Sequence, residues 1–205
     1  YYIRKNVFPV TDVSPHLTSS RINTVGARLS SPLYRSLSAT TEAAFQFGRD
    51  HAVNDRGDVV KVDYAAGGGY IHIDYVPAWP QYAPAQLTGG AIYLSGDDPA
   101  TSDNEDWHPV FARWPKWSES YIYTQIPEDD VAWWTNLVSI YGRALFRFSP
   151  KISFGLDFHR LYAAEEPTAD DNMGGTGRIR GSLVIGKVDF RIDDHITGHL
   201  LWEGF

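Results

Sequence analysis

Several groups of side chains in this sequence are of types that could do chemistry. Asp157 and His159 lie two residues apart, with Ser139 and Ser153 close by in the sequence, so the components of a Ser-His-Asp triad are present. On a strand, however, side chains two residues apart stand about 6 to 7 Å from each other, too far for a direct Asp–His hydrogen bond. The GxSxG and HExxH motifs are absent from the sequence. We therefore expect no enzymatic activity.

A second group is the acidic stretch DDPATSDNED, whose charged residues are Asp97, Asp98, Asp103, Glu105 and Asp106. Carboxylates suit Ca²⁺, but the spacing and the glycine of an EF-hand loop are missing. We predict a solvated acidic loop, with calcium binding as the alternative. His195, His199 and Glu203 do not have the spacing of a metal site on a regular element. We expect no cofactor and no structural metal.

The aromatic segment that follows, Trp107–Trp117, leaves three roles open. Its rings could stack on sugars, anchor the loop at a membrane interface, or fold the loop into the mouth of a barrel.

Composition excludes other chemistry. The 205 residues contain no cysteine, which removes disulfides, thiolate metal sites and cysteine nucleophiles. The formal net charge of -7 argues against a nucleic-acid partner. No run of about eighteen apolar residues is present, so we expect no helical membrane span.

The elements that position these side chains are predicted to be strands. Between Val138 and Arg160, apolar or small residues occupy the even positions before and after Ser149–Lys151, and nearly all polar residues occupy the odd positions. A period of two indicates strands, and the tight link between the two runs indicates an antiparallel hairpin. Its apolar face could pack inside a soluble sandwich, or it could face lipid in a membrane barrel.

The same alternation extends along the chain. It predicts nine strands: Tyr1–Phe8, Asn23–Leu33, Ser36–Gly48, Val59–Tyr75, Gln86–Ser95, the two strands of Val138–Arg160, Ile179–Ile192 and Ile196–Trp202. Within the fourth, Gly67–Gly69 predicts a bulge or bend, and we assign no faces beyond Ala66.

The connections between these strands alternate between short and long. Long polar connections are expected near residues 49–58, 96–120 and 164–177, within a single domain that covers residues 1–205. Short turns on one side and long loops on the other are typical of outer-membrane barrels, and many of the strands are long enough to cross a bilayer. We therefore favour an all-β, antiparallel up-and-down transmembrane β-barrel over a soluble carbohydrate-binding β-sandwich.

Two motifs resemble the alginate-export family of bacterial outer-membrane porins. The family typically shows a strand with an inward Glu and Gln before a Gly, and TEAAFQFG matches it with Glu42, Gln46 and Gly48. It also shows a Tyr-x-Ser-Gly-Asp-Asp stretch that enters a long acidic loop, matched here by Tyr93, Ser95, Gly96, Asp97 and Asp98. The closing GHLLWEGF is similar to a late strand of such proteins.

The resemblance implies a bacterial outer-membrane barrel of roughly eighteen strands that passes an anionic polysaccharide such as alginate. The nine strands here are then expected to be the C-terminal half of the barrel, or part of it. The expected partners are outer-membrane lipid and an anionic polysaccharide or small anionic solute, with any envelope protein partners unknown. A porin-like component without a dedicated cargo is the alternative.

If the apolar faces meet lipid, the opposite faces line an aqueous lumen. We predict that the lumen is lined by Arg28, Glu42, Gln46, Arg143, Arg147, Asp157, His159, Lys187, Asp189, Arg191, His199 and Glu203, together with Arg4, Lys61 and Asp63. Basic residues outnumber acidic ones in this set, so a slightly positive interior is expected to attract a polyanion. The simpler reading is that the charges pair across strands and stiffen the wall.

Overall fold

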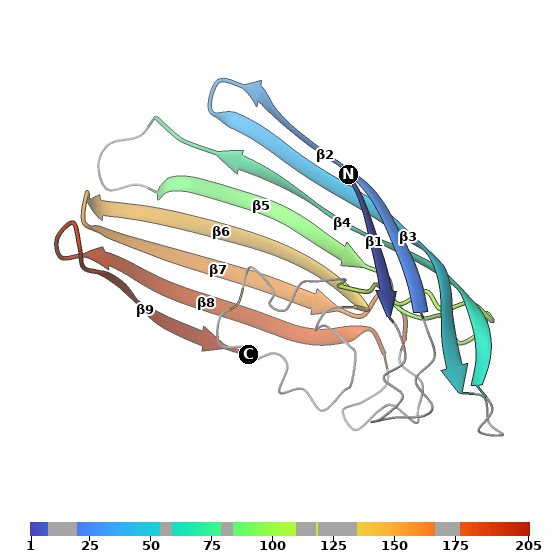
Figure 1. The fold of residues 1–205 in the computed structure, drawn as a ribbon. Coiled ribbons are helices and arrows are strands. Elements are labelled where there is room, and N and C mark those ends of the chain that lie inside the picture. The colour runs from blue at the N-terminus through green and yellow to red at the C-terminus, as the bar shows by residue number, and fades with distance from the viewer. Residues whose placement is uncertain (8–19, 54–58, 79–83, 110–117, 119–134, 167–176) are drawn as a thin grey trace.

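The computed structural model describes residues 1–7, 20–53, 59–78, 84–109, 118, 135–166 and 177–205. The described chain is all-β, and it forms one antiparallel sheet of nine strands (Figure 1). The strands are β1 (Tyr2–Val7), β2 (Ser20–Tyr34), β3 (Leu37–Val53), β4 (Val59–Tyr75), β5 (Pro84–Leu94), β6 (Leu137–Ser149), β7 (Ile152–Tyr162), β8 (Ile179–Arg191) and β9 (Thr197–Gly204).

Each strand pairs only with its neighbours in the sequence, in the order β1 to β9. This order confirms the predicted antiparallel up-and-down arrangement and all nine predicted strands. The sheet is curved and open, with β1 and β9 at its two edges (Figure 1). The strand ends that the links β2–β3, β4–β5, β6–β7 and β8–β9 join therefore lie along one end of the sheet, which we call the turn end. The strand ends that the other links join lie along the opposite end, which we call the loop end (Figure 1).

The register divides the side chains between two faces. Phe45 on β3 lies opposite Val25 and Gly67, and Phe158 on β7 lies opposite Gly142 and Val184. We call this side the apolar face; away from the register shifts at the ends of some strands, it carries the odd residues of β2–β5 and the even residues of β6–β9. The other side, which we call the polar face, carries the remaining residues of these strands.

Of the bulge or bend predicted at Gly67–Gly69, the bulge is wrong, because the β3–β4 register runs through all three glycines without a shift. Gly69 is needed for a close approach: a Cβ there would lie 2.3 Å from the Glu42 carbonyl oxygen. The continuous register also corrects two predicted lumen residues. Lys61 and Asp63 fall on the side of Phe45, not on the polar face.

Two further expectations are corrected by the pairing. Arg4 lies opposite Asn23, which in turn lies opposite Phe47, so Arg4 belongs to the apolar side. Residues 49–53, predicted to begin a loop, instead extend β3 and pair with Val59–Asp63.

Burial across the sheet is inverted relative to a soluble protein. Many large apolar side chains of the apolar face are exposed, from 43 % for Phe47 and Leu156 to 68 % for Leu200, and others such as Phe146 and Phe154 are half-buried. On the polar face, by contrast, Gln46 and Ser139 are 0 % exposed. Burying polar groups while leaving large apolar groups uncovered is unfavourable in water. The apolar face therefore favours a less polar environment than water.

The apolar cores lie on the polar face toward the loop end. One cluster joins β6, β7 and β8 through Leu137, Leu161 and Leu183, and a smaller one joins Ile22, Tyr64 and Ala66. Among the described residues, no helix is long and apolar enough to cross a membrane.

Candidate functional site

The segment that follows β5 folds back over the polar face. Ser95, directly after β5, binds both ends of this fold-back. Its carbonyl accepts hydrogen bonds from the Trp107 and Asn136 backbone N–H groups, at 3.1 and 2.9 Å. The Ser95 hydroxyl donates to the Glu105 carbonyl at 2.6 Å. Asn104 then bonds through its backbone to both Asp63 and Ala65 of β4. The described part of this segment, residues 96–109, is thus tied to the sheet.

Gln46 on β3 holds this segment by pairing its amide with a peptide group. The Gln46 side-chain nitrogen donates to the His108 carbonyl at 2.7 Å, and the His108 N–H donates to the Gln46 side-chain oxygen at 2.9 Å. The same amide nitrogen donates to the Thr24 hydroxyl at 3.2 Å. Tyr64 adds hydrogen bonds from its hydroxyl to Gln46 and to the Asp106 carbonyl. Gln46 is therefore an anchor for the segment.

Other contacts extend the attachment across the sheet. The Trp107 ring lies on Gly68, where a Cβ would come within 2.7 Å of the indole. Lys5 on β1 meets His108, with 3.1 Å between Nζ and Nε2. Farther along, the buried Ser118 hydroxyl donates to the Glu203 carboxylate of β9 at 2.8 Å. The segment therefore has contacts with β1, β3 and β4 on one side and β9 on the other.

These contacts address the open roles of Trp107–Trp117. Its first residues, Trp107 and His108, pack on the polar face of the sheet, and the three roles stay predictions. Residues 110–117 lie outside the described part of the chain.

The acidic side chains of this segment are used locally. Asp97 accepts the Glu105 N–H at 3.0 Å, and Glu105 accepts the Asp98 N–H at 3.0 Å. Asp106 accepts the Thr135 hydroxyl at 3.0 Å. Among the residues that the structure describes, no group of three or more His, Asp or Glu side chains is placed to hold a metal ion.

In the middle of the polar face, charges are matched across strands. Arg143 on β6 binds Asp157 on β7 in a bidentate pair, with Nε and Nη2 to carboxylate distances of 2.6 to 2.9 Å. The Asp74 carboxylate accepts from Gln86 and Thr88 at 2.9 and 2.6 Å. A groove of about 370 Å³ lies here, lined by two cations (Arg143, Lys187) and three carboxylates (Asp157, Asp189, Glu203), a formal charge of 2 − 3 = −1. This part of the face is not positive, so the slightly positive charge predicted for the whole face is not found here.

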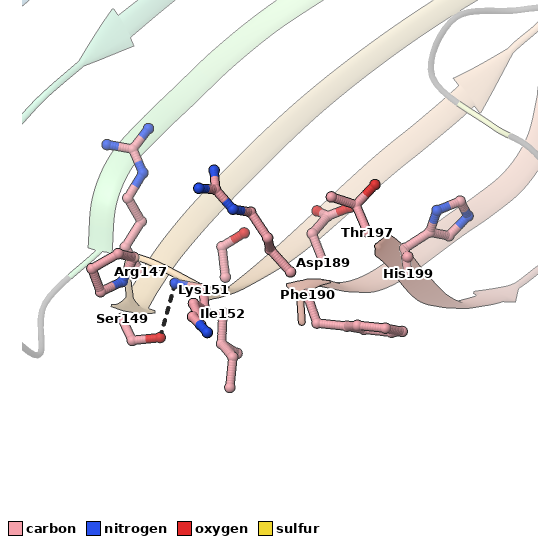
Figure 2. Close-up of a pocket in the computed structure, with 12 residues that line it drawn as sticks. Arg147, Ser149, Lys151, Ile152, Asp189, Phe190, Thr197 and His199 are labelled. Atoms are coloured by element: carbon pink, nitrogen blue, oxygen red, sulfur yellow. Dashed lines mark hydrogen bonds between the residues drawn. The ribbon is translucent and has the colours of Figure 1, made fainter. Parts of the chain in front are cut away.

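The turn end of the same face has the opposite charge. A second groove, of about 460 Å³, is lined by three cations (Arg147, Lys151, Arg191) and one carboxylate (Asp189), a formal charge of 3 − 1 = +2. Figure 2 shows Arg147, Thr197 and His199 projecting to one side of the strands and Ile152 to the other. The positive charge of the polar face is thus concentrated near the short turns.

The candidate triad residues are placed differently from a working hydrolase site. Ser139 and His159 do approach each other, with 3.1 Å between Oγ and Nδ1, which sequence spacing alone did not reveal. They are 0 % and 1 % exposed, and the Tyr141 ring stacks on His159 with 5.1 Å between ring centroids. Asp157 is bound by Arg143. The Ser139 hydroxyl is therefore buried in this arrangement.

The strand pairing puts every residue of the predicted lumen set, except Arg4, Lys61 and Asp63, on the polar face. Their role in lining a channel stays a prediction. Gln46, His159, Asp157 and Glu203 are at most 9 % exposed, so they support the face and its folded segment more than they present a surface to solutes.

Sequence reasoning missed several residues of this site. Asn136 was not singled out, although its side-chain amide pairs with the Glu165 backbone N–H and carbonyl at 2.7 and 3.1 Å, as Gln46 pairs with His108. Lys5 and Asp74 were also missed. The face on which Lys5 and Asp74 lie could have been inferred from the faces assigned to the strands that pair with theirs.

No family model matches the chain, and no curated protein matches it.

Proposed function

We propose that this chain forms part of the wall of an outer-membrane β-barrel channel of the alginate-export type, which conducts an anionic polysaccharide or small anionic solutes. The observation that carries the proposal is the inverted polarity of the sheet: Phe158 and Leu200 are 50 % and 68 % exposed on one face, while Gln46 is buried on the other. An apolar outer surface and a polar inner surface are what lipid and an aqueous lumen require.

The arrangement of the connections supports the same proposal. Strand ends joined by the shortest links lie at one end of the sheet and those joined by the longest links at the other, as in outer-membrane barrels. β1 and β9 have free edges within the described sheet. Lipid does not tolerate unpaired backbone, so a barrel requires further strands between these two edges. We propose that such strands complete the wall.

A soluble carbohydrate-binding sandwich is supported less well. In a sandwich the apolar face would pack against a second sheet at about 10 Å. The described strands form a single sheet, and Phe45, Ile71 and Ile140 on its apolar face are each 50 % exposed or more.

Anion preference in a planar bilayer tests the channel function. Reconstituted protein is expected to pass chloride in preference to potassium, and the double variant Arg28→Gln/Arg147→Gln is expected to lower that preference, because both arginines are exposed on the polar face. The matched control is the double variant Arg4→Gln/Arg49→Gln, which removes the same amount of charge from the apolar face. Equal loss of selectivity in the two double variants would refute the face assignment, and cation preference in the wild type would refute the cargo class.

A further inference from the structure

The groove at the turn end has the features of a binding site for one anionic group. We propose that it holds a single oxyanion, the carboxylate, sulfate or phosphate of a passing solute, at the turn end of the polar face. The inference deepens the proposed function and rests on it, since it states where on the channel wall the anion is held. The groove has a volume of about 460 Å³, within the range of about 300 to 1,000 Å³ usual for small-ligand sites.

Arg147 is the residue best placed to bind the anion. It projects to the polar side of β6 (Figure 2), it is exposed, and it makes no hydrogen bond or ion pair with any residue in the described parts of the chain. A guanidinium in this state offers its donors in a planar fork that matches an oxyanion. Arg143, four residues earlier on the same face of β6, already binds both carboxylate oxygens of Asp157.

The other cations of the groove are fixed in place. Lys151 donates from Nζ to the Ile192 carbonyl at 2.9 Å, and Arg191 donates from Nη2 to Asp194 at 2.8 Å. These contacts hold positive charge over the groove from the β6–β7 and β8–β9 turns without filling it.

The single carboxylate of the groove is partly compensated. Asp189 lies 3.7 Å from Lys187, measured from Oδ1 to Nζ, and Lys187 is outside the lining of this groove. Asp194 offsets Arg191 from outside the lining in the same way, so the two outside partners cancel and the groove keeps its formal charge of +2. Thr197 adds a hydroxyl that can donate to the same ligand.

The middle of the face lacks these features. Its groove carries a formal charge of −1, and its arginine is paired. An anion moving along the polar face would therefore be held at the turn end and released toward the middle. Weak, localised binding of this kind allows passage, because a tightly bound solute would block the channel.

The test is a titration of the detergent-solubilised chain with sodium sulfate at low ionic strength, followed by amide NMR. Saturable shifts are expected for residues 147–153 and 189–199, with a dissociation constant in the millimolar range, about 1 mM. Glucuronate is expected to shift the same amides, because it carries a carboxylate, and glucose is not. Arg147→Gln should weaken sulfate binding roughly tenfold.

The matched control is Arg35→Gln, which removes the same charge from the β2–β3 turn at the same end of the sheet, outside the groove. It should leave sulfate binding unchanged. If it weakens binding as much as Arg147→Gln does, the effect is that of the general surface potential, and the site is refuted. Non-saturating shifts, or equal shifts with glucose, refute it as well.

This readout separates the site from the channel. Saturable sulfate binding without any bilayer current would leave the site standing and remove the proposed function. Anion-preferring current with sulfate binding unaffected by Arg147→Gln would remove the site and leave the function.

Discussion

Phe158→Arg is expected to lower the free energy of unfolding from a lipid bilayer by about 2 to 4 kcal/mol, the usual effect of a cation near the midplane on the lipid face of a barrel. Phe158 lies within β7, opposite Gly142 and Val184 on the apolar face, and is 50 % exposed. If the apolar face met water, the same change would remove an exposed ring and alter stability by about 0.5 kcal/mol or less. The two solvents therefore predict very different results.

Depth provides the control for this prediction. Phe148 is on the same face, 58 % exposed, but lies beside the Ser149–Lys151 turn. Phe148→Arg should reduce stability by about 1 kcal/mol or less, because the cost of a charge falls toward the interface. Denaturant unfolding in vesicles measures both variants. Equal and small effects at the two positions would contradict a lipid-facing surface.

Gln46→Leu is expected to release the folded segment from the polar face. The variant keeps most of the side-chain volume but leaves the His108 N–H and carbonyl without the partners they have at 2.9 and 2.7 Å. An unsatisfied buried polar group costs about 1 to 3 kcal/mol, so docking should weaken by about 2 kcal/mol or more. Hydrogen exchange of the His108 amide should accelerate roughly 30-fold, which corresponds to that free energy.

The matched variant is Gln86→Leu. Gln86 is also an amide on the polar face, but it bonds to Asp74 and Thr88 rather than to the segment after β5. His108 exchange should be unchanged in Gln86→Leu. Unchanged exchange in Gln46→Leu would show that the amide pairing does not hold the segment, and faster exchange in both variants would point to a general loosening of the face.

Much of the fold could be predicted because its signal is local. Alternation of side chains with period two is set by each strand's own backbone, so the faces of β2, β3 and β6–β9 could be assigned from the sequence. The Ser149–Lys151 turn identified the β6–β7 hairpin for the same reason. Strand ends were less certain, as the extension of β3 to Val53 shows.

What failed depended on contacts between distant residues. The local alternation put Lys61 and Asp63 on the polar side, but the pairing of β4 with β3 places the apolar Tyr64 and Ala66 on the polar face instead, in a buried cluster, so Lys61 and Asp63 were misplaced. The sequence of β3 alone predicts Gln46 as a lumen residue. Its role as an anchor depends on His108, which lies 62 residues later in the chain and packs against it. The pairing of Arg143 with Asp157 likewise required the β6–β7 register, and it moved the positive charge of the face to the turn end.

The central claim is that the apolar face contacts lipid and the polar face contacts water. The chain has no cysteine, so single cysteines can be introduced along β7 and spin-labelled without background. In reconstituted vesicles, labels at Phe154, Leu156 and Phe158 should be reached by oxygen and shielded from a water-soluble nickel complex, and labels at Ser153 and Gly155 should show the reverse. If the nickel complex reaches both sets equally, the sheet does not separate lipid from water, and the membrane channel proposed for this chain is refuted.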